Sequence, residues 1–201
     1  MKIAVVASEV PSDLRKIIDI DSYLVYACDG AVEPLLKQKI AIELAIGDFD
    51  SLEDRSLLEG IKVIKLNEVK DYSDTYFALQ KAYESADEVI LIGGIKGDRA
   101  DHFIANVMLL KKYPDLIIMD ETNIIKLLTK GTYPIKKGGF TYLSIFPLED
   151  IKITLTGVLY PLIEEELSSY DVLGLSNVIK PKYATLHLHR GTILLIQSKE
   201  K

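Results

Sequence analysis

The chain has 201 residues, of which 24 are Lys or Arg and 30 are Asp or Glu, so its net charge is −6 at neutral pH. This length allows one large domain or two small ones. A hydrophobic content of 48% and a charged content of 27% exclude wholesale disorder, and the acid excess argues against broad nucleic-acid binding. The single cysteine, Cys28, excludes a disulfide framework and a cysteine-rich zinc site. No apolar run suits a signal peptide or a membrane helix, so we expect a cytoplasmic protein with no membrane partner.

Short apolar runs alternate with amphipathic stretches through the first part of the chain. We expect strands over residues 3–7, 23–27, 43–46, 62–66, 89–92 and 116–119. Because these runs lack polar alternation, the strands are expected to be buried on both faces of a parallel sheet. Ser51 and Ser73 are placed to cap helices over 52–59 and 74–86, and Pro114 ends a third helix over 101–113. The repeated strand–helix units predict an open, mostly parallel α/β sheet.

After about residue 122 the helical periodicity disappears and the pattern becomes that of a β domain. Strands are expected over 124–129, 140–146, 151–155, 184–189 and 192–197, and the last two are predicted to form a hairpin. The sequence therefore predicts an α/β domain over 1–122 and a smaller antiparallel β-sandwich or barrel-like domain over 123–201.

Acidic residues recur at the predicted strand ends and helix starts of the first domain. Any one of them alone is explained as a helix cap or a turn residue. Their recurrence at the same end of consecutive units favours a shared crevice, because ligands of open α/β sheets bind outside the carboxyl ends of the strands. The clusters contain Asp29, then Asp48 and Asp50, then Asp71 and Asp74, and finally Asp98 and Asp101.

Converging carboxylates limit what such a crevice can bind. Two carboxylates about 4 Å apart repel each other by about 4 kcal/mol at an effective dielectric near 20, so they need a cation or shared protons. Mg²⁺ fits best, because it is bound by one or two carboxylates together with substrate phosphates. We predict Asp48, Asp50, Asp71 and Asp74 as its ligands.

A glycine run, GGIKGDR over 93–99, follows a predicted strand and precedes a predicted helix. Free backbone N–H groups and two cations make it a candidate phosphate cradle through Gly94, Lys96, Gly97 and Arg99. The run is neither a Walker A loop nor a dinucleotide fingerprint. We interpret it as a phosphate site because the acidic residues at the other strand ends could bind Mg²⁺, which binds together with substrate phosphates.

Taken in order, these segments resemble thiamine pyrophosphokinase over nearly the whole chain. The resemblance is carried by CDGA (28–31), AIGDFDSL (45–52), KDYSDTYFAL (70–79), GGIKGDRADHFIANV (93–107), YLSIFPL (142–148), GVLYPL (157–162), LSN (175–177) and RGTILLI (190–196). It implies transfer of diphosphate from Mg-ATP to the hydroxyethyl oxygen of thiamine, with attack at the β-phosphorus and AMP as the second product. It also implies a nucleotide cleft in the first domain and a homodimer with thiamine near the interface.

The resemblance assigns roles by position. Asp48, Asp50, Asp71, Ser73, Asp74 and Asp101 match metal, phosphate and catalytic positions, while Asp29 matches an acidic active-site position. Arg99 matches an arginine at the phosphates, and Ser176 and Asn177 match a thiamine-side pair. Asp71, Asp74 and Asp101 stay open as alternatives for the group that orients or deprotonates the hydroxyl.

The chain departs from the family pattern at three points. Asp98 replaces a common glycine, Ser73 stands where Thr is common, and no Trp is present, which leaves Tyr170 as a candidate neighbour of thiamine. Two other functions stay open: diphosphate transfer to another alcohol such as a hydroxymethylpterin, and a non-catalytic thiamine or nucleotide sensor. His187 and His189 share a face of a predicted strand, and half-exposed strand positions explain them better than a metal site does.

Overall fold

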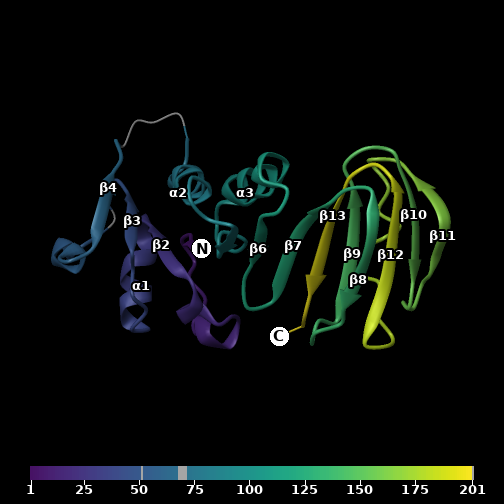
Figure 1. Cartoon of the computed structure of the whole chain (residues 1–201), viewed down its shortest axis with the longest axis horizontal. Coiled ribbons are helices and arrows are strands. Elements are labelled where there is room, and N and C mark those ends of the chain that lie inside the picture. The colour runs from purple at the N-terminus through teal and green to yellow at the C-terminus, as the bar shows by residue number, and fades with distance from the viewer. Residues whose placement is uncertain (51, 68–71, 201) are drawn as a thin grey trace. The chain divides into compact units, whose positions relative to one another are not determined.

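The computed structural model describes residues 1–50, 52–67 and 72–200, so the predicted cap Ser51 and the predicted ligand Asp71 lie outside the described residues. The chain forms two compact units, Met1–Glu121 (unit 1) and Thr122–Lys201 (unit 2), which Figure 1 shows in chain-order colours. Within the described ranges, no helix combines the length and the apolar character that crossing a membrane requires.

Unit 1 is built on parallel strands in the order β4-β3-β2-β1-β5-β6. Neighbouring strands are in register without interruption; Val5 of β1, for example, pairs with Tyr26 on one side and Leu91 on the other. The strands are β1 (Lys2–Val6), β2 (Leu24–Cys28), β3 (Leu44–Gly47), β4 (Lys62–Lys65), β5 (Glu88–Ile92) and β6 (Ile117–Met119). All six lie at the predicted places, which confirms the parallel α/β class.

Burial along the strands follows the apolar runs, except at β4 and in part at β6, where only Ile118 is buried. β1, β2, β3 and β5 are buried over most of their length, as expected for strands with residues packed on both faces. The expectation is wrong for β4, whose Lys62, Val63 and Lys65 are exposed. β4 stands last in the strand order, so its side chains are less covered than those of a central strand.

Three α-helices cover this sheet: α1 (Val32–Lys37), α2 (Asp74–Tyr83) and α3 (Ala100–Lys112). Figure 1 shows α1 on one side of the strands and α2 and α3 on the other. Ser73 caps α2 as predicted, because its Oγ accepts the Tyr76 N–H at 3.2 Å. The sequence pattern does not predict α1, which is less than two turns long.

The predicted helix over 52–59 is wrong. The chain there forms only a short 3-10 turn, Arg55–Leu58. Asp54 caps it by accepting the Ser56 N–H at 2.9 Å and the Ser56 hydroxyl at 2.6 Å, and such local bonds hold a turn instead of a longer helix. Leu52 is buried in the unit 1 core, so the segment is fixed by packing before the turn begins.

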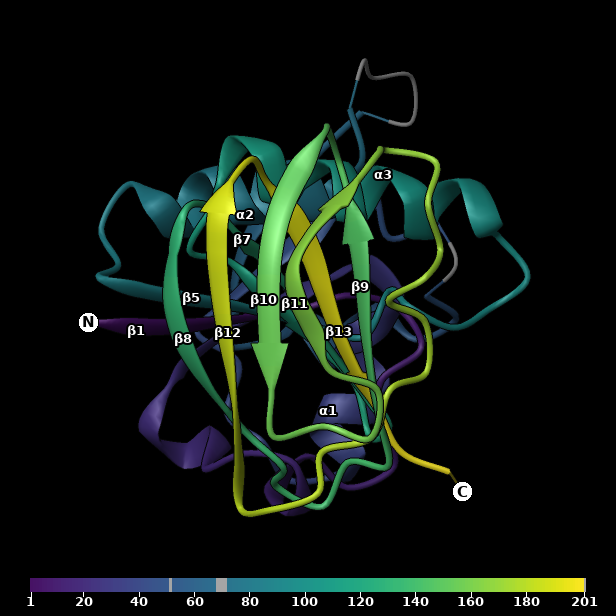
Figure 2. The ribbon, with the colours of Figure 1, turned by 90° about the vertical axis from the view of Figure 1, so that its right-hand side faces the viewer.

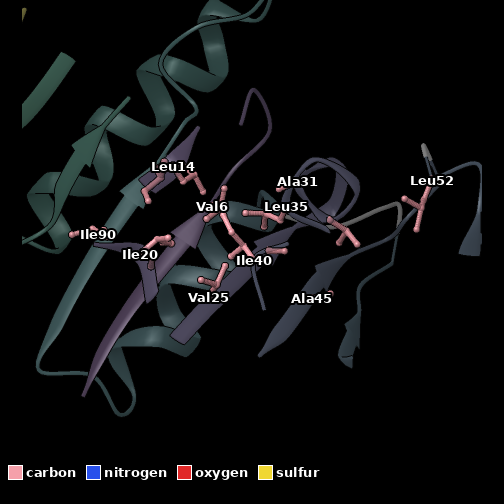
Figure 3. Close-up of a cluster of buried hydrophobic side chains, with 14 of the residues drawn as sticks. Val6, Leu14, Ile20, Val25, Ala31, Leu35, Ile40, Ala45, Leu52 and Ile90 are labelled. Atoms are coloured by element: carbon pink, nitrogen blue, oxygen red, sulfur yellow. The ribbon is translucent and has the colours of Figure 1, made fainter. Parts of the chain in front are cut away.

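One hydrophobic core of unit 1 joins the sheet to α1 and to the segments that connect the strands (Figure 3). Val6 and Val25 come from central strands, Leu35 from α1, and Leu14 and Ile20 from the connection between β1 and β2; each is at most 2% exposed. Burial of this size contributes roughly 1.5–3 kcal/mol for each large side chain. It fixes the strand ends from which the acidic residues extend.

Unit 2 is a sandwich of two antiparallel sheets, as the β pattern predicts. One group has the order β7-β13-β9 and the other β11-β10-β12-β8, which Figure 2 shows in front of β13 and β9. The strands are β7 (Asn123–Leu128), β8 (Gly131–Lys136), β9 (Tyr142–Pro147), β10 (Ile151–Thr156), β11 (Leu162–Leu167), β12 (Tyr183–Arg190) and β13 (Ile193–Ser198). Their alternate apolar residues form one shared core, with Ile145 and Leu195 from one sheet and Ile153 and Leu186 from the other.

The hairpin predicted for the last two strands is wrong. β12 pairs with β10 and β8, whereas β13 pairs with β7 and β9, so the chain crosses from one sheet to the other between them. Gly191 makes this crossing with φ 87°, where an added Cβ would lie 2.7 Å from Ile151 Cγ2. The glycine therefore marks a change of sheet instead of a hairpin turn.

Candidate functional site

The strand-end acids of unit 1 line one cavity of about 740 Å³. Asp29 follows β2 and Asp48 and Asp50 follow β3, while Asp74 begins α2. Because parallel strands present their carboxyl ends at one edge, residues that are distant in sequence meet there. Of the predicted site residues, Asp29, Asp48, Asp50, Ser73, Asp74 and Arg99 line this cavity.

Three of these acids form a tight group. Carboxylate oxygens of Asp29, Asp48 and Asp50 all lie within 4.8 Å of one another. Asp29 and Asp48 are partly buried and Asp50 is exposed, so the group opens to solvent at Asp50. Hard carboxylate oxygens at this spacing fit a cation such as Mg²⁺. Sequence reasoning assigned Asp29 to the site but not to the metal, although its place at a strand end was the available signal.

The backbone holds this group in a constrained conformation. Phe49, between the two other acids, is 3% exposed and belongs to the unit 1 core. Its φ is +56°, which is unusual for a bulky residue, and Asp29 also has a positive φ of 37°. Asp29 Oδ1 accepts the Phe49 N–H at 3.0 Å, so the acid after β2 is tied to the loop after β3.

Gly47, the last residue of β3, leaves room for Asp29. A Cβ at Gly47 would lie 3.0 Å from both Cα and Cβ of Asp29. The close approach of the two strand ends therefore requires a residue without a side chain. Together, Phe49 and Gly47 determine where the three carboxylates meet.

The glycine loop after β5 lines an adjoining cavity of about 220 Å³, which shares four residues with the larger one: Ser8, Thr75, Arg99 and His102. Gly94 has φ +66°, and a Cβ there would lie 2.5 Å from Nδ2 of the buried Asn106. That amide nitrogen donates to the Gly94 carbonyl at 3.0 Å and fixes the loop on α3.

The loop accommodates Asp98 at the position where the sequence resemblance implies a glycine. Asp98 is not among the residues with positive φ, so its backbone does not require glycine. Gly97, the preceding residue, takes the left-handed conformation with φ +111°. The loop therefore keeps its turn without a second glycine at 98.

Arg99 and Asp101 form an exposed bidentate pair. Arg99 Nε donates to Asp101 Oδ1 at 2.9 Å and Nη2 donates to Oδ2 at 2.6 Å. The hydrogen bonds from Arg99 lower the pKa of Asp101 to about 2. At neutral pH Asp101 is thus a carboxylate that places the guanidinium beside the cavity.

Lys96, the other predicted phosphate-binding cation, lies in a second ion-pair group. Its Nζ donates to Glu121 Oε2 at 2.7 Å and lies 3.3 Å from Oδ2 of the buried Asp120. Glu121 also accepts the Ser12 N–H at 3.0 Å, so the lysine is held at the end of unit 1. Lys96 lines the smaller cavity with Gly94 and Gly97.

The larger cavity is also lined by five residues that were not predicted as site residues: Ser8, Cys28, Tyr72, Thr75 and His102. Ser8 follows β1 and Thr75 lies in the first turn of α2; the strand-end rule that found the acids would have found Ser8. Cys28, the last residue of β2, is buried and also lines the cavity. Desolvation raises the pKa of its thiol, and the nearby charge of Asp74 adds to the effect, so the thiol stays protonated at neutral pH.

The predicted thiamine-side residues lie in unit 2. Asn177 is 4% exposed, and its side chain bonds to the backbone: Oδ1 accepts the N–H groups of Tyr160 and Val178, and Nδ2 donates to the Tyr160 carbonyl at 2.7 Å. Asn177 therefore organises the segment before β11. Ser176 is exposed with φ 56°, and Tyr170 is 83% exposed.

The two histidines of β12 lie with their ring centroids 4.1 Å apart. His187 Nδ1 and Thr132 Oγ1 are 2.8 Å apart, and His189 Nε2 and Thr154 Oγ1 are 2.9 Å apart. His187 is exposed and His189 partly buried, as expected for half-exposed strand positions.

The unit 1 site combines two chemical capacities. A cluster of hard oxygen donors can bind a divalent cation, and a glycine loop with Arg99 and Lys96 can bind phosphate oxygens. Carboxylates without a cation would repel a polyanion, so the two capacities suit a ligand that arrives as a metal–phosphate complex.

Comparison with known proteins identifies relatives along most of the chain. Residues 15–124 match the family described as thiamin pyrophosphokinase, catalytic domain, and residues 132–193 match its vitamin B1 binding domain. The chain is 33% identical over 183 residues to a thiamine pyrophosphokinase of Bacillus subtilis, covering 86% of each protein. Crystal structures of thiamine pyrophosphokinases from B. subtilis and Geobacillus thermodenitrificans are similar over the whole chain, with TM-scores of 0.89 and 0.88 and identities of 29% and 30%. Alignment covers 100% and 99% of those two chains.

Proposed function

The chain belongs to the thiamine pyrophosphokinase family and is a transferase of that kind, and on this premise we propose that it moves the diphosphate of ATP to thiamine. Thiamine diphosphate formation is the activity that the family supports. In the proposed reaction the hydroxyethyl oxygen of thiamine bonds to the β-phosphorus and the bond from that phosphorus to the α-phosphate oxygen breaks. AMP leaves and the hydroxyl proton passes to a carboxylate.

The observation that carries the proposal is the group of Asp29, Asp48 and Asp50 in the larger cavity, next to the glycine loop and Arg99. We propose that these three acids, with Asp74 of the same cavity and with Asp71, form the site for Mg²⁺, in which one or two of the carboxylates bind an ion directly. A bound Mg²⁺ would supply charge neutralisation at the polyphosphate oxygens. The chain's own residues would bind the phosphates, orient the attacking hydroxyl and accept its proton.

The cations and the glycine loop are proposed to bind the phosphates. Arg99 lines both cavities, and hydrogen bonds to Asp101 hold its guanidinium in place. Lys96 lines the smaller cavity. The Gly94 N–H donates to the Ser8 carbonyl at 3.2 Å, so the backbone N–H groups nearer Gly97 and the hydroxyl of Ser73 are proposed to complete the phosphate contacts. Fixed donors of this kind stabilise charge that develops during phosphoryl transfer.

A carboxylate is proposed to orient the attacking hydroxyl and accept its proton. Asp71, Asp74 and Asp101 are the candidates. Asp74 is favoured because it lines the larger cavity. Asp101 is a weaker base, because the hydrogen bonds from Arg99 lower its pKa to about 2.

Unit 2 is proposed to bind thiamine and to form a homodimer. The match to a vitamin B1 binding domain covers Ser176 and Asn177, which supports thiamine over a hydroxymethylpterin. Large apolar side chains at Ile163, Val172 and Leu173 are more than 60% exposed, a surface that a second copy would cover. Sedimentation equilibrium tests this assembly, and a monomer throughout the micromolar range would contradict it.

A cytoplasmic location is also proposed, since a single cysteine suits a reducing compartment.

The proposed reaction is tested by measuring AMP released on addition of thiamine, with Mg²⁺ and with EDTA. We expect AMP only with both thiamine and Mg²⁺. Asp74→Asn removes one charge without removing the Ser73 cap, so it is expected to stay folded and to lose at least 99% of this activity. Asp115→Asn, an exposed acid in the turn after α3, is the matched control and should retain it.

Two results would contradict the proposal. Near-normal turnover by Asp74→Asn would remove that residue from the mechanism. A preference for hydroxymethylpterin over thiamine in direct competition would change the substrate.

A further inference from the structure

Unit 2 contains a cavity of its own, with a volume of about 330 Å³. It lies between the two sheets of the sandwich, because its walls come from β7 and β13 of one sheet and β8 of the other. The apolar wall is formed by Ile124, Leu128, Tyr133, Ile135, Phe140 and Leu195. This volume equals the space of about eleven water molecules and falls at the lower end of small-molecule sites.

Lys126 of β7 lines this apolar cavity. It alternates with Ile124 and Leu128 on one face of the strand and pairs directly with Leu195 of β13. Lys126 is partly buried, and its desolvation lowers the pKa of the ammonium group. Within the described ranges the side chain has no hydrogen bond or ion pair, so an amine is held among apolar groups without a counter-ion.

The rest of the lining adds a fixed polar group and no acid. Lys136 also borders the cavity, but it is exposed and alternates with Ile135 along β8, so its side chain lies on the opposite face of the strand. No Asp or Glu is among the described residues that line the cavity. Gln197 is 8% exposed and its Nε2 donates to the Lys136 carbonyl at 2.9 Å, which ties β13 to β8 across the cavity. The cavity is therefore apolar and contains one amine, and a hydrogen bond links its two sheets.

The end of the cavity is shaped by the turn after β8. Gly138 and Gly139 have φ 56° and 88°, a conformation that glycine adopts at little cost. The turn brings Phe140 into the wall, and the Phe140 N–H donates to the Lys137 carbonyl at 2.9 Å. Phe140 thus lines the cavity from this turn.

We propose that this cavity is a binding site for a small monoanion with an apolar body, in which a carboxylate pairs with Lys126. The apolar walls match an aliphatic or aromatic body, and the unpaired amine matches one negative charge. A phosphate ester fits less well, because it carries close to two charges and needs several donors. None of these residues belongs to the proposed catalytic machinery, so the inference does not depend on the proposed reaction.

Octanoate is the probe for this site, with octanol as its neutral counterpart and inorganic phosphate as the anion without an apolar body. In calorimetric titrations of the full chain we expect octanoate to bind with submillimolar Kd, at least tenfold more tightly than octanol, and phosphate not to bind. In ¹⁵N–¹H spectra octanoate is expected to shift the amides of Ile124, Leu128, Phe140 and Gln197.

Lys126→Met keeps the length and apolar stem of the side chain and removes the charge. We expect it to weaken octanoate binding at least tenfold and to leave octanol binding unchanged. Lys130→Met, at an exposed lysine in the turn between β7 and β8, is the matched control and should bind octanoate like the original chain. Both variants should retain thiamine-dependent AMP formation.

The proposal is overturned by equal octanoate binding in Lys126→Met, by octanol binding as tightly as octanoate, or by phosphate binding more tightly. Amide shifts confined to other parts of the chain also overturn it. If Lys126→Met does not fold, the comparison of octanoate with octanol and the amide shifts of the unaltered chain decide the question.

Discussion

The position of the Asp29 carboxylate depends on the absence of a Cβ atom at Gly47. The strand that ends at Gly47 passes so close to Asp29 that even a methyl group would lie 3.0 Å from its Cα and Cβ. Asp29 in turn accepts a hydrogen bond from Phe49, which stands between the other two acids. The position of the carboxylate group therefore depends on a residue that has no functional group.

Gly47→Ala is expected to displace Asp29 and the loop of Asp48 and Asp50. Overpacking of this kind costs about 1–3 kcal/mol, so the variant should fold with a lower melting temperature. We expect calorimetry to show affinity for Mg²⁺ with a non-hydrolysable ATP analogue falling at least tenfold. Gly30→Ala is the control, because an added Cβ there meets nothing nearer than Ser8 Oγ at 3.9 Å. Unchanged metal–nucleotide affinity in Gly47→Ala would contradict this account.

Much of this site is predictable at the level of residues because the signal is local. An apolar run followed at once by Asp places a carboxylate at a strand end, as at Asp29 after β2 and Asp48 after β3, and these two places converge because the strands are parallel. The positive φ of Phe49 and the bond from Phe49 to Asp29 are not predictable in this way. They depend on contacts between β2 and β3, which periodicity along one segment does not encode.

At the scale of elements, the errors have a common cause in long-range packing. β13 lies between β7 and β9, so its pairing partners are remote in sequence. The predicted hairpin is wrong because it was inferred from the fact that β12 directly precedes β13 in the sequence. β8 and β11 were not predicted: Pro134 lies within β8, and three glutamates interrupt the apolar pattern of β11. Each is paired with a neighbour of a four-stranded sheet, and tertiary context outweighs propensity in such strands.

The crossing at Gly191 can be tested against a glycine of the same conformation. Gly191→Ala places a methyl group 2.7 Å from Ile151 Cγ2 and 3.0 Å from the Asp150 carbonyl oxygen, at φ 87°. Gly139 has φ 88° but nothing within 4 Å of an added Cβ, so Gly139→Ala isolates the conformational cost. That cost is about 1–2 kcal/mol.

Urea denaturation is expected to show Gly191→Ala less stable than Gly139→Ala by a further 1–3 kcal/mol or so, since overpacking adds to the backbone strain. Similar midpoints for the two variants would mean that the sheets move apart at little cost. The crossing would then not be a fixed point of the sandwich.

At the scale of the whole molecule, the net charge of −6 is a poor guide to partners, whereas the placement of the acids is a good one. A net negative charge disfavours nucleic acid, but the three grouped carboxylates have the spacing that suits a cation, and we propose that this cation accompanies a polyphosphate. The same group repels itself when no cation is present. Two unit charges 4.8 Å apart, a distance that no separation in the group exceeds, interact by roughly 1 kcal/mol in water and roughly 3.5 kcal/mol at a dielectric of 20.

This repulsion predicts opposite effects of one substitution under two conditions. Asp50 is the exposed member of the group, so Asp50→Asn removes a charge with little loss of packing. In EDTA we expect the variant to melt at the same temperature as the original chain or above it. With Mg²⁺ and a non-hydrolysable ATP analogue at about 100 times the Kd, the original chain should gain about 2.7 kcal/mol, and the variant should lose most of that gain.

Asp115→Asn serves as the control in the same thermal scans, because it removes an exposed charge that lies outside the carboxylate group. It should keep the full shift with Mg²⁺ and nucleotide. Retention of the full shift by Asp50→Asn would exclude Asp50 from metal binding, whereas a lower melting temperature in EDTA would show that its charge stabilises the loop. We expect Asp50→Asn to be as stable as the original chain or more stable without metal, and to lose the stabilisation by Mg²⁺ and nucleotide. Both effects together arise only if the grouped acids bind a cation and their mutual repulsion destabilises the fold when no cation is bound.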